Sequence, residues 1–291
     1  MEYVSLIMDI EKSRTYGIDD RIEIQNYMSD CVGMLNELFQ QDIKFEVTFS
    51  GGDEMQGLFC DVTSAILYFR LLEMLLKPVK LRAGIGVGAW TIKVDNGLST
   101  QQDGPVYHLA RKAIDEVYKK QFHNIRICTG KDEDILANHL LNASVTLKTQ
   151  QIYMQNIVLV IAELLCPFIK NQRKDISNKT IGALIQTKFN YKIGKRRNYN
   201  ESRLNYYNEN LNFDLPFYNS PIFIDGNISE SEVPLTKKNM SSYIADILGC
   251  TRQNVDSIIR RGNVGKIREL DYVALQYIEK NYGENTWNYC L

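Results

Sequence analysis

Two acidic segments that lie far apart in the sequence have the residue types of a divalent-cation site. Asp9 ends a short apolar run, and Asp53 and Glu54 follow the glycine pair Gly51-Gly52 at a turn. Carboxylates held a few ångströms apart repel each other and need a cation, and oxygen ligands select Mg²⁺ or Mn²⁺. Glycines at the turn let a phosphate group approach the backbone. The pattern therefore predicts a metal site at Asp9 and Asp53 that binds a polyphosphate; the alternative is a plain turn whose acids are solvated.

The elements around these residues predict how they meet. Strand and helix patterns alternate over residues 1–130, with strands at 3–10, 44–50, 55–60, 79–92 and 125–128 and helices at 22–39, 61–76 and 105–118. This order fits an α+β sheet of the ferredoxin-like or palm type, with its helices on one face. The first strand then lies beside the hairpin, so Asp9 faces Asp53. The carbonyl oxygen of Ile10 is a candidate further ligand, and Glu54 is a candidate ligand or base.

A second glycine motif, Gly84-x-Gly86-x-Gly88, lies inside the expected strand 79–92. A dinucleotide-binding fingerprint would instead lie in a turn that opens a helix, so that function is excluded. Glycines at alternate positions of a strand indicate that a neighbouring backbone or a ligand approaches closely.

The remaining residues divide into three segments. Residues 131–170 predict a helical connector, with one helix over 136–168. Residues 171–235 are rich in Asn and Tyr and predict an irregular polar insert or linker. Within them, basic and aromatic residues at 188–197 have the chemistry of a single-strand nucleic-acid patch, although a solvated loop is the favoured alternative. Residues 236–291 predict an all-α helix-turn-helix domain.

The helix-turn-helix prediction rests on the spacing around Gly249. The small residue Ala245 lies four positions before this glycine, and Val255 and Ile258 follow six and nine positions after it. This spacing lets two helices cross closely. The outward-facing side chains suit base edges and phosphates, and they are Thr251, Arg252, Gln253, Asn254, Ser257 and Arg261. We therefore predict contact with DNA; the alternative is a helical hairpin used only for packing or dimerisation.

Composition and charge exclude several classes of protein. The chain has 34 basic and 35 acidic residues and a formal net charge of −1, so a nonspecific polyanion binder is excluded and any nucleic-acid contact must be local. No apolar run approaches the ~20 residues of a bilayer span, and the first residues lack the basic region of a signal peptide. The 6 cysteines form no C-x-x-C pair, which fits a reducing compartment and argues against zinc. We predict a cytoplasmic protein with no membrane partner.

Four motifs in this order and spacing resemble the SatD family, at residues 7–10, 50–58, 82–88 and 103–111. More broadly, Asp9-Ile10 followed by the Gly51–Glu54 turn is similar to the metal site of the palm superfamily. That superfamily includes class III nucleotidyl cyclases, GGDEF diguanylate cyclases and the CRISPR polymerase subunit. The SatD resemblance covers residues 1–130 and about 240–275, and that family also ends in a helix-turn-helix.

The resemblance implies a Mg²⁺- or Mn²⁺-dependent site for a nucleoside triphosphate. By similarity to palm cyclases, Asp9 and Asp53 are implied as metal ligands and Arg111 as a catalytic residue. Together with the residues singled out above, the predicted site has the metal ligands Asp9, Ile10 and Asp53, the nucleotide-binding Ile10, Gly51 and Gly52, and the catalytic Asp9, Asp53, Glu54 and Arg111. Arg111 would steady the charge of the transition state in cyclisation or nucleotidyl transfer. Because such cyclases place the active site between two subunits, a homodimer is implied as well, which would also suit a palindromic DNA site.

Two positions depart from the cyclase pattern. Phe49 stands where cyclases have a base-reading lysine, and Tyr107 stands where they have an asparagine. The nucleotide base is therefore not predicted. Two alternatives to an enzyme stay open: a non-catalytic, nucleotide-sensing transcriptional regulator of the SatD type, and a scaffold that keeps the palm fold without its activity.

Overall fold

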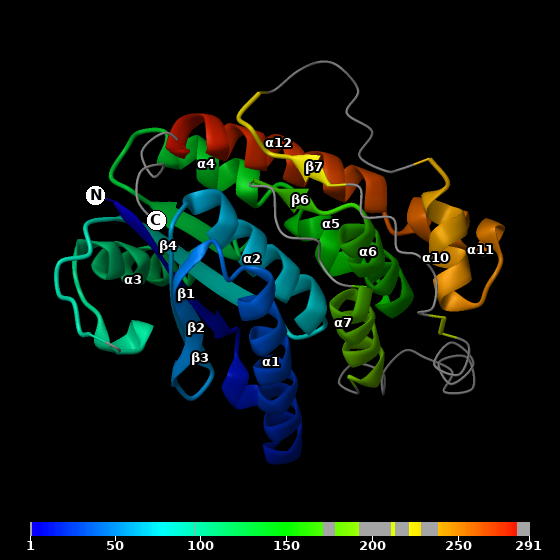
Figure 1. The fold of residues 1–291 in the computed structure, drawn as a ribbon, viewed down its shortest axis with the longest axis horizontal. Coiled ribbons are helices and arrows are strands. Elements are labelled where there is room, and N and C mark those ends of the chain that lie inside the picture. The colour runs from blue at the N-terminus through cyan, green and yellow to red at the C-terminus, as the bar shows by residue number, and fades with distance from the viewer. Residues whose placement is uncertain are drawn as a thin grey trace.

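A five-stranded mixed sheet forms the centre of the computed structural model, which describes residues 2–95, 97–170, 178–191, 211–212, 221–227 and 238–283 (Figure 1). The strands are β1 (Tyr3–Ile10), β2 (Ile43–Gly51), β3 (Glu54–Phe59), β4 (Leu81–Gly88) and β5 (Ile125–Cys128), in the spatial order β2-β3-β1-β4-β5. β1 is antiparallel to β3 and β4, β2 and β3 form the predicted hairpin, and β5 is parallel to β4. The α+β class is confirmed, and the first strand lies beside the hairpin as predicted.

Helices cover both faces of this sheet. The even-numbered residues of β1 share one hydrophobic core with α1 (Ile18–Leu38) and α2 (Val62–Leu76). On the opposite face Ile7 packs with Ala110 and Ile114 of α3 (Pro105–Val117). The prediction that the helices share one face is therefore wrong for α3. Two 3₁₀ turns, η1 (Ser13–Thr15) and η2 (Ser99–Gln101), lie in the connecting loops.

Gly84 and Gly86 explain why α3 lies where it does. A Cβ added to Gly84 would lie 2.3 Å from the carbonyl oxygen of Ala110, and one added to Gly86 would lie 2.2 Å from that of Val106. Because these glycines lack side chains, the backbone of α3 rests directly on β4. The predicted close approach is confirmed, and the approaching group is a helix backbone.

Residues 131–170 form three helices in place of the expected long one, namely α4 (Asp134–Leu141), α5 (Val145–Gln150) and α6 (Tyr153–Leu165), followed by β6 (Phe168–Ile169). Side chains of α4 explain the first break. Asn138 and Asn142 bond to backbone groups of β5, with Ile127 N 2.7 Å from Asn138 Oδ1 and Asn142 Nδ2 2.9 Å from Ile125 O. The helix therefore covers the sheet edge and ends there. Almost all of α6 is buried.

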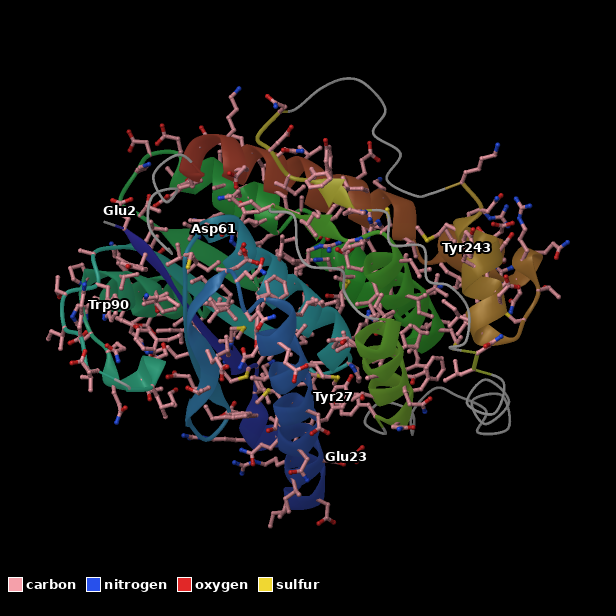
Figure 2. All side chains as sticks on the ribbon, in the orientation of Figure 1. Glu2, Glu23, Tyr27, Asp61, Trp90 and Tyr243 are labelled. Carbon is pink, nitrogen blue, oxygen red and sulfur yellow. The ribbon has the colours of Figure 1, made fainter. Side chains whose placement is uncertain are left out.

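Part of the segment predicted as irregular is helical. α7 (Asn178–Asn190) packs beside α1 (Figure 2). Tyr191, the residue after α7, stacks on Tyr27 with ring centroids 3.9 Å apart. Lys188 is fully buried and donates from Nζ to the carbonyl oxygens of Leu75 and Lys77, at 2.6 and 2.5 Å. It therefore caps the end of α2 and cannot belong to a solvent-facing nucleic-acid patch. Phe189 and Tyr191 of that predicted patch are buried as well, and its residues 192–197 lie outside the described residues.

The C-terminal helices pack onto the rest of the chain. They are α10 (Met240–Leu248), α11 (Arg252–Arg261) and α12 (Val264–Tyr282), and α12 runs across α2, α4 and α6 (Figure 1). β7 (Ile222–Phe223) pairs with β6. Across the described part of the chain, no helix has both the length and the apolar character needed to cross a bilayer. The domain boundaries at 130, 170 and 235 stay predictions.

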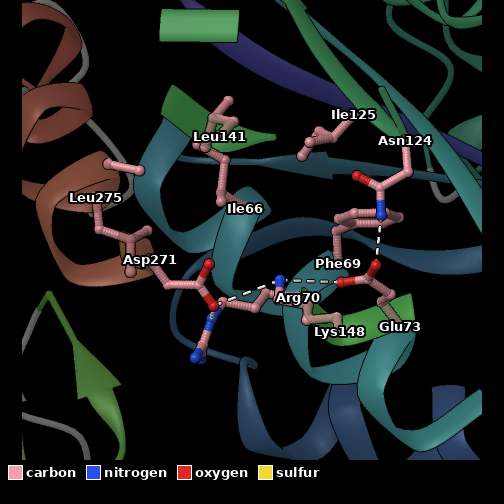
Figure 3. Close-up of a pocket in the computed structure, with 11 residues that line it drawn as sticks. Ile66, Phe69, Arg70, Glu73, Asn124, Ile125, Leu141, Lys148, Asp271 and Leu275 are labelled. Carbon is pink, nitrogen blue, oxygen red and sulfur yellow. Dashed lines mark hydrogen bonds and ion pairs between the residues drawn. The ribbon is translucent and has the colours of Figure 1, made fainter. Parts of the chain in front are cut away.

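A buried cluster of charged side chains joins α12 to α2 and α5 (Figure 3), and Glu163 extends it to α6. Arg70 of α2 donates from Nε to Asp271 of α12 at 2.6 Å, and its Nη1 lies 2.6 Å from Glu163 of α6. Lys148 of α5 lies 3.4 Å from Asp271 and 3.2 Å from Glu73. Because these charges are removed from water, each depends on its partner.

Candidate functional site

The strand register places Asp9 between two charged residues on the face covered by α3. Asp9 lies directly opposite Arg82 in the pairing of β1 with β4. Met8 lies opposite Met55 in the pairing of β1 with β3, so the next position along places Asp9 beside Glu54. Directly opposite residues of antiparallel strands point to the same face. The first strand and the hairpin therefore meet at the acids, as the sequence predicts.

Both carboxylate oxygens of Asp9 are engaged by groups of the chain. Arg82 Nε lies 3.0 Å from Oδ1, and the hydroxyl of Tyr118, the residue after α3, donates to Oδ2. The Arg82 guanidinium also stacks on the Tyr118 ring, 3.7 Å from its centroid. Asp9, Arg82 and Tyr118 thus form a closed unit, which we call the Asp9 triad.

The surroundings of Asp9 act on its pKa in opposite directions. Burial raises the pKa of its carboxyl group, since only 8% of the residue is exposed, and the nearby charge of Asp53 adds to the rise. The hydrogen bonds from Tyr118 and Arg82, with the positive charge of Arg82, lower it. Burial is the largest effect, so the pKa of Asp9 lies above its ordinary value. The effect of Asp53 indicates that the two predicted ligands are close enough to interact.

Glu54 is paired with Arg111 in a two-pronged ion pair. Arg111 Nη1 lies 2.5 Å from Oε2 of Glu54, and Nη2 lies 2.7 Å from Oε1. The Ser50 hydroxyl also donates to Glu54, at 2.9 Å. These bonds, chiefly the one from Arg111, lower the pKa of Glu54. The Arg111 side chain is 47% exposed, so a ligand from solvent can reach it.

The hairpin tip is open. Gly52 has a φ of 61° and Asp53 follows it, which is the order of a tight turn with glycine first. No atom lies within 4 Å of a Cβ built on Gly51 or Gly52. Gln25 of α1 donates to the carbonyl of Gly52 at 3.1 Å and steadies the tip. The tip therefore offers a partly exposed Asp53 carboxylate beside backbone that a ligand can approach.

These residues fit a divalent cation only in part. Carboxylates suit Mg²⁺ or Mn²⁺, but a cation at Asp9 must compete with a guanidinium and a hydroxyl that already hold both oxygens. Among the described residues, no group of three or more His, Cys, Asp and Glu side chains is arranged to hold a metal ion. Both oxygens of Asp9 have partners within the chain, and ligation of a cation by Asp9, Asp53 and the Ile10 carbonyl stays a prediction.

Sequence reasoning missed Arg82 and Tyr118. Arg82 lies two residues before Gly84 in the expected strand 79–92, and Tyr118 is the last residue of the helix predicted over 105–118. Neither residue has a role in the site predicted from the sequence. One signal was available for Arg82: it is a charged residue between Leu81 and Ala83 at the start of a buried strand. Tyr107, at the position of the cyclase asparagine, is buried in a small core with Tyr3 and Leu58.

The predicted DNA-contacting residues lie around the start and outer face of α11. Thr251 accepts a hydrogen bond from Asn254 N and so begins the helix, after Gly249 has turned the chain with a φ of 60°. Arg252, Gln253 and Arg261 are exposed, while Asn254 and Ser257 are partly buried. Val255 is the buried contact of α11, as predicted. The described geometry leaves the arginines accessible, and DNA contact stays a prediction.

Comparison with known proteins identifies one family. The model of the SatD family matches residues 3–205, well over half of the chain. Two solved structures of a bacterial light-regulated adenylyl cyclase are 14% identical to it, and they cover 44% and 43% of this chain and 42% and 74% of their own, with TM-scores of 0.33 and 0.31. This chain therefore spans less than half the length of the first. No curated protein matches.

Proposed function

The chain belongs to the SatD family, and from that premise we propose that its sheet binds a nucleotide as a sensor and that the protein is a nucleotide-responsive DNA-binding regulator without turnover. The observation that carries this proposal is the closed Asp9 triad. A cyclase needs carboxylates that are free to hold metal ions at the reacting phosphates. In the absence of ligand Arg82 and Tyr118 occupy that carboxylate. Tyr107, which stands where cyclases have an asparagine, is buried in the core, and both features favour binding over cyclisation.

The proposed ligand is a nucleoside triphosphate with its bound Mg²⁺, at the hairpin tip. Asp53 supplies a carboxylate oxygen for the ion, and Gly51 and Gly52 leave room for phosphates. Arg111 is paired with Glu54, and its side chain is exposed to solvent. It can therefore exchange the Glu54 carboxylate for a phosphate, because a guanidinium binds both groups through paired hydrogen bonds. The ion supplies positive charge that this acidic tip lacks.

DNA binding is proposed for α11 because the predicted contact residues Arg252, Gln253 and Arg261 are exposed on it. Residues 236–291 carry only two more basic than acidic side chains, so one copy gives few phosphate contacts. A homodimer would double them and match a palindromic site, and we include it in the proposal.

Titration calorimetry with each NTP and Mg²⁺ tests the nucleotide site. We expect one nucleotide per chain, and at least about tenfold weaker binding by Asp53→Asn, the loss of one charged ligand. Asp132→Asn is the matched control, because Asp132 is an exposed acid that follows β5 at the far end of the sheet from Asp9. Equal affinities for these two variants would contradict the proposed site.

The same samples separate a sensor from an enzyme. We expect nucleotide to change the fluorescence anisotropy of labelled genomic fragments at low salt, and Arg252→Ala to weaken that response. No cyclic or oligomeric product should form. Product that disappears in Asp9→Asn would instead establish the cyclase, and failure to bind any genomic DNA with an intact fold would remove the regulator.

A further inference from the structure

The Asp9 triad contains more contacts than a simple ion pair of two residues would. Each oxygen of the carboxylate has its own donor, and the two donors contact each other through the stacking of Arg82 on Tyr118. Tyr118 lies at the C-terminal end of α3 and is 52% exposed. Its side chain can therefore leave Asp9 without opening the core, unlike the buried partners of Arg70.

We propose that Tyr118 and Arg82 are a gate on Asp9, which excludes a free divalent cation and admits one that arrives with a phosphate. The inference rests on the proposed nucleotide site and adds its regulation. The ligand class that opens the gate is a phosphate ester with a bound divalent cation.

Two physical effects keep a free cation out. The cation must displace the Tyr118 hydroxyl, which donates a hydrogen bond to a charged acceptor, the stronger kind of such bonds. It must also approach the guanidinium of Arg82, whose like charge repels it across a partly buried site. Because Arg82 stacks on Tyr118, moving one disturbs the contact with the other.

A phosphate removes both obstacles. Its oxygens accept hydrogen bonds from a hydroxyl and a guanidinium alike, so Tyr118 and Arg82 exchange the Asp9 carboxylate for the phosphate. Asp9 is then free to face the cation together with Asp53, whose charge already acts on it. Cation and phosphate thus bind cooperatively, because each makes the site available to the other.

Tyr118→Phe tests the gate, because it removes the hydroxyl and keeps the ring that stacks on Arg82. The probe is Mn²⁺ alone, and the loss of the electron paramagnetic resonance signal of free Mn²⁺ measures binding without any activity. We expect Tyr118→Phe to bind Mn²⁺ about tenfold more tightly than wild type. Arg82→Gln should change affinity in the same direction. Tyr277→Phe, a partly buried tyrosine on α12, is the control and should match wild type.

A second substitution assigns the gained binding to Asp9. The double variant Asp9→Asn/Tyr118→Phe should lose the gain. Unchanged Mn²⁺ affinity in Tyr118→Phe, absence of Mn²⁺ binding in all variants, or a gain that survives loss of Asp9 would each overturn the gate. These results do not depend on the nucleotide. An Asp53-dependent nucleotide site without a Tyr118 effect refutes the gate alone, and a gated Asp9 without nucleotide binding refutes the proposed function alone.

Discussion

Replacing Asp271 by asparagine should unfold the chain at a much lower temperature, because it leaves two buried cations short of a partner. Asp271 accepts from Arg70 at 2.6 Å and lies 3.4 Å from Lys148, and it is 6% exposed. Burial raises the pKa of this carboxyl group, but Lys148 and Arg70 more than offset burial and hold the pKa below its ordinary value. The aspartate is therefore charged at neutral pH and stabilises the fold.

The expected magnitude follows from the burial of the cluster. Removing one partner of a buried ion pair costs about 3–5 kcal/mol. Asparagine keeps the size and one acceptor, so the lower end of that range, ~3 kcal/mol, is expected. For a chain of this size each kcal/mol of lost stability lowers Tm by roughly 2 °C, so Tm should fall by about 6 °C. Glu269→Gln changes an exposed acid of the same helix and should alter stability by less than about 0.5 kcal/mol.

Denaturant unfolding followed by circular dichroism measures the difference between these variants. A loss for Asp271→Asn no larger than that for Glu269→Gln would refute the reasoning, since the buried cations would then not need this carboxylate. The double variant Arg70→Met/Asp271→Leu removes the Arg70–Asp271 pair together and should recover part of the loss, because Lys148 keeps Glu73 and Glu163 keeps Arg268 as a partner. Recovery separates the unpaired charge from a simple defect of packing.

Two further predictions concern packing and protonation. Gly84→Ala should cost about 1–3 kcal/mol in denaturant unfolding, because its Cβ would lie 2.3 Å from the backbone of α3, whereas Gly33→Ala on α1 has open space and should not destabilise. Burial lowers the pKa of Lys77 to about 8; between pH 8 and 10.5 the unfolded chain therefore holds a proton that the folded chain has lost, and stability from this group rises with pH. From pH 7 to pH 10 the free energy of unfolding of wild type should therefore rise relative to that of Lys77→Met. A difference between the two proteins that does not change with pH would contradict this.

Sequence patterns predicted the features that depend on residues close together in the chain. The hairpin of β2 and β3 follows from alternating residues around Gly51-Gly52, and the close contact at Gly84 and Gly86 follows from glycines inside a strand. The break after α4 did not follow, because Asn142 ends that helix by bonding to β5, a strand that precedes it in the sequence. Periodicity carries no information about such a partner.

The candidate site shows the same division. That β1 and the hairpin would bring Asp9 near Asp53 was predictable, since strand order alone decides it. That Asp9 would be held by Arg82 and Tyr118 was not, because it needs the register of β4 and the exact length of α3. A pattern of acidic residues in a sequence indicates that a positive charge lies nearby. Only the structure shows that one such charge beside Asp9 is the guanidinium of Arg82.

The coupling that the proposed function requires has a physical carrier in α2. Its C-terminal carbonyls are held by Lys188, and the chain continues from there within a few residues to Arg82 at the start of β4. Its middle is held to α12 through Arg70 and Asp271. A contiguous network alone does not establish coupling, which needs an element with two states that both sites bias. The proposed partner exchange by Arg82 between Asp9 and a phosphate would supply such an element near the C-terminal end of α2. α12 contacts the middle of α2 and follows directly on α11, the helix proposed to contact DNA, so it would receive any displacement.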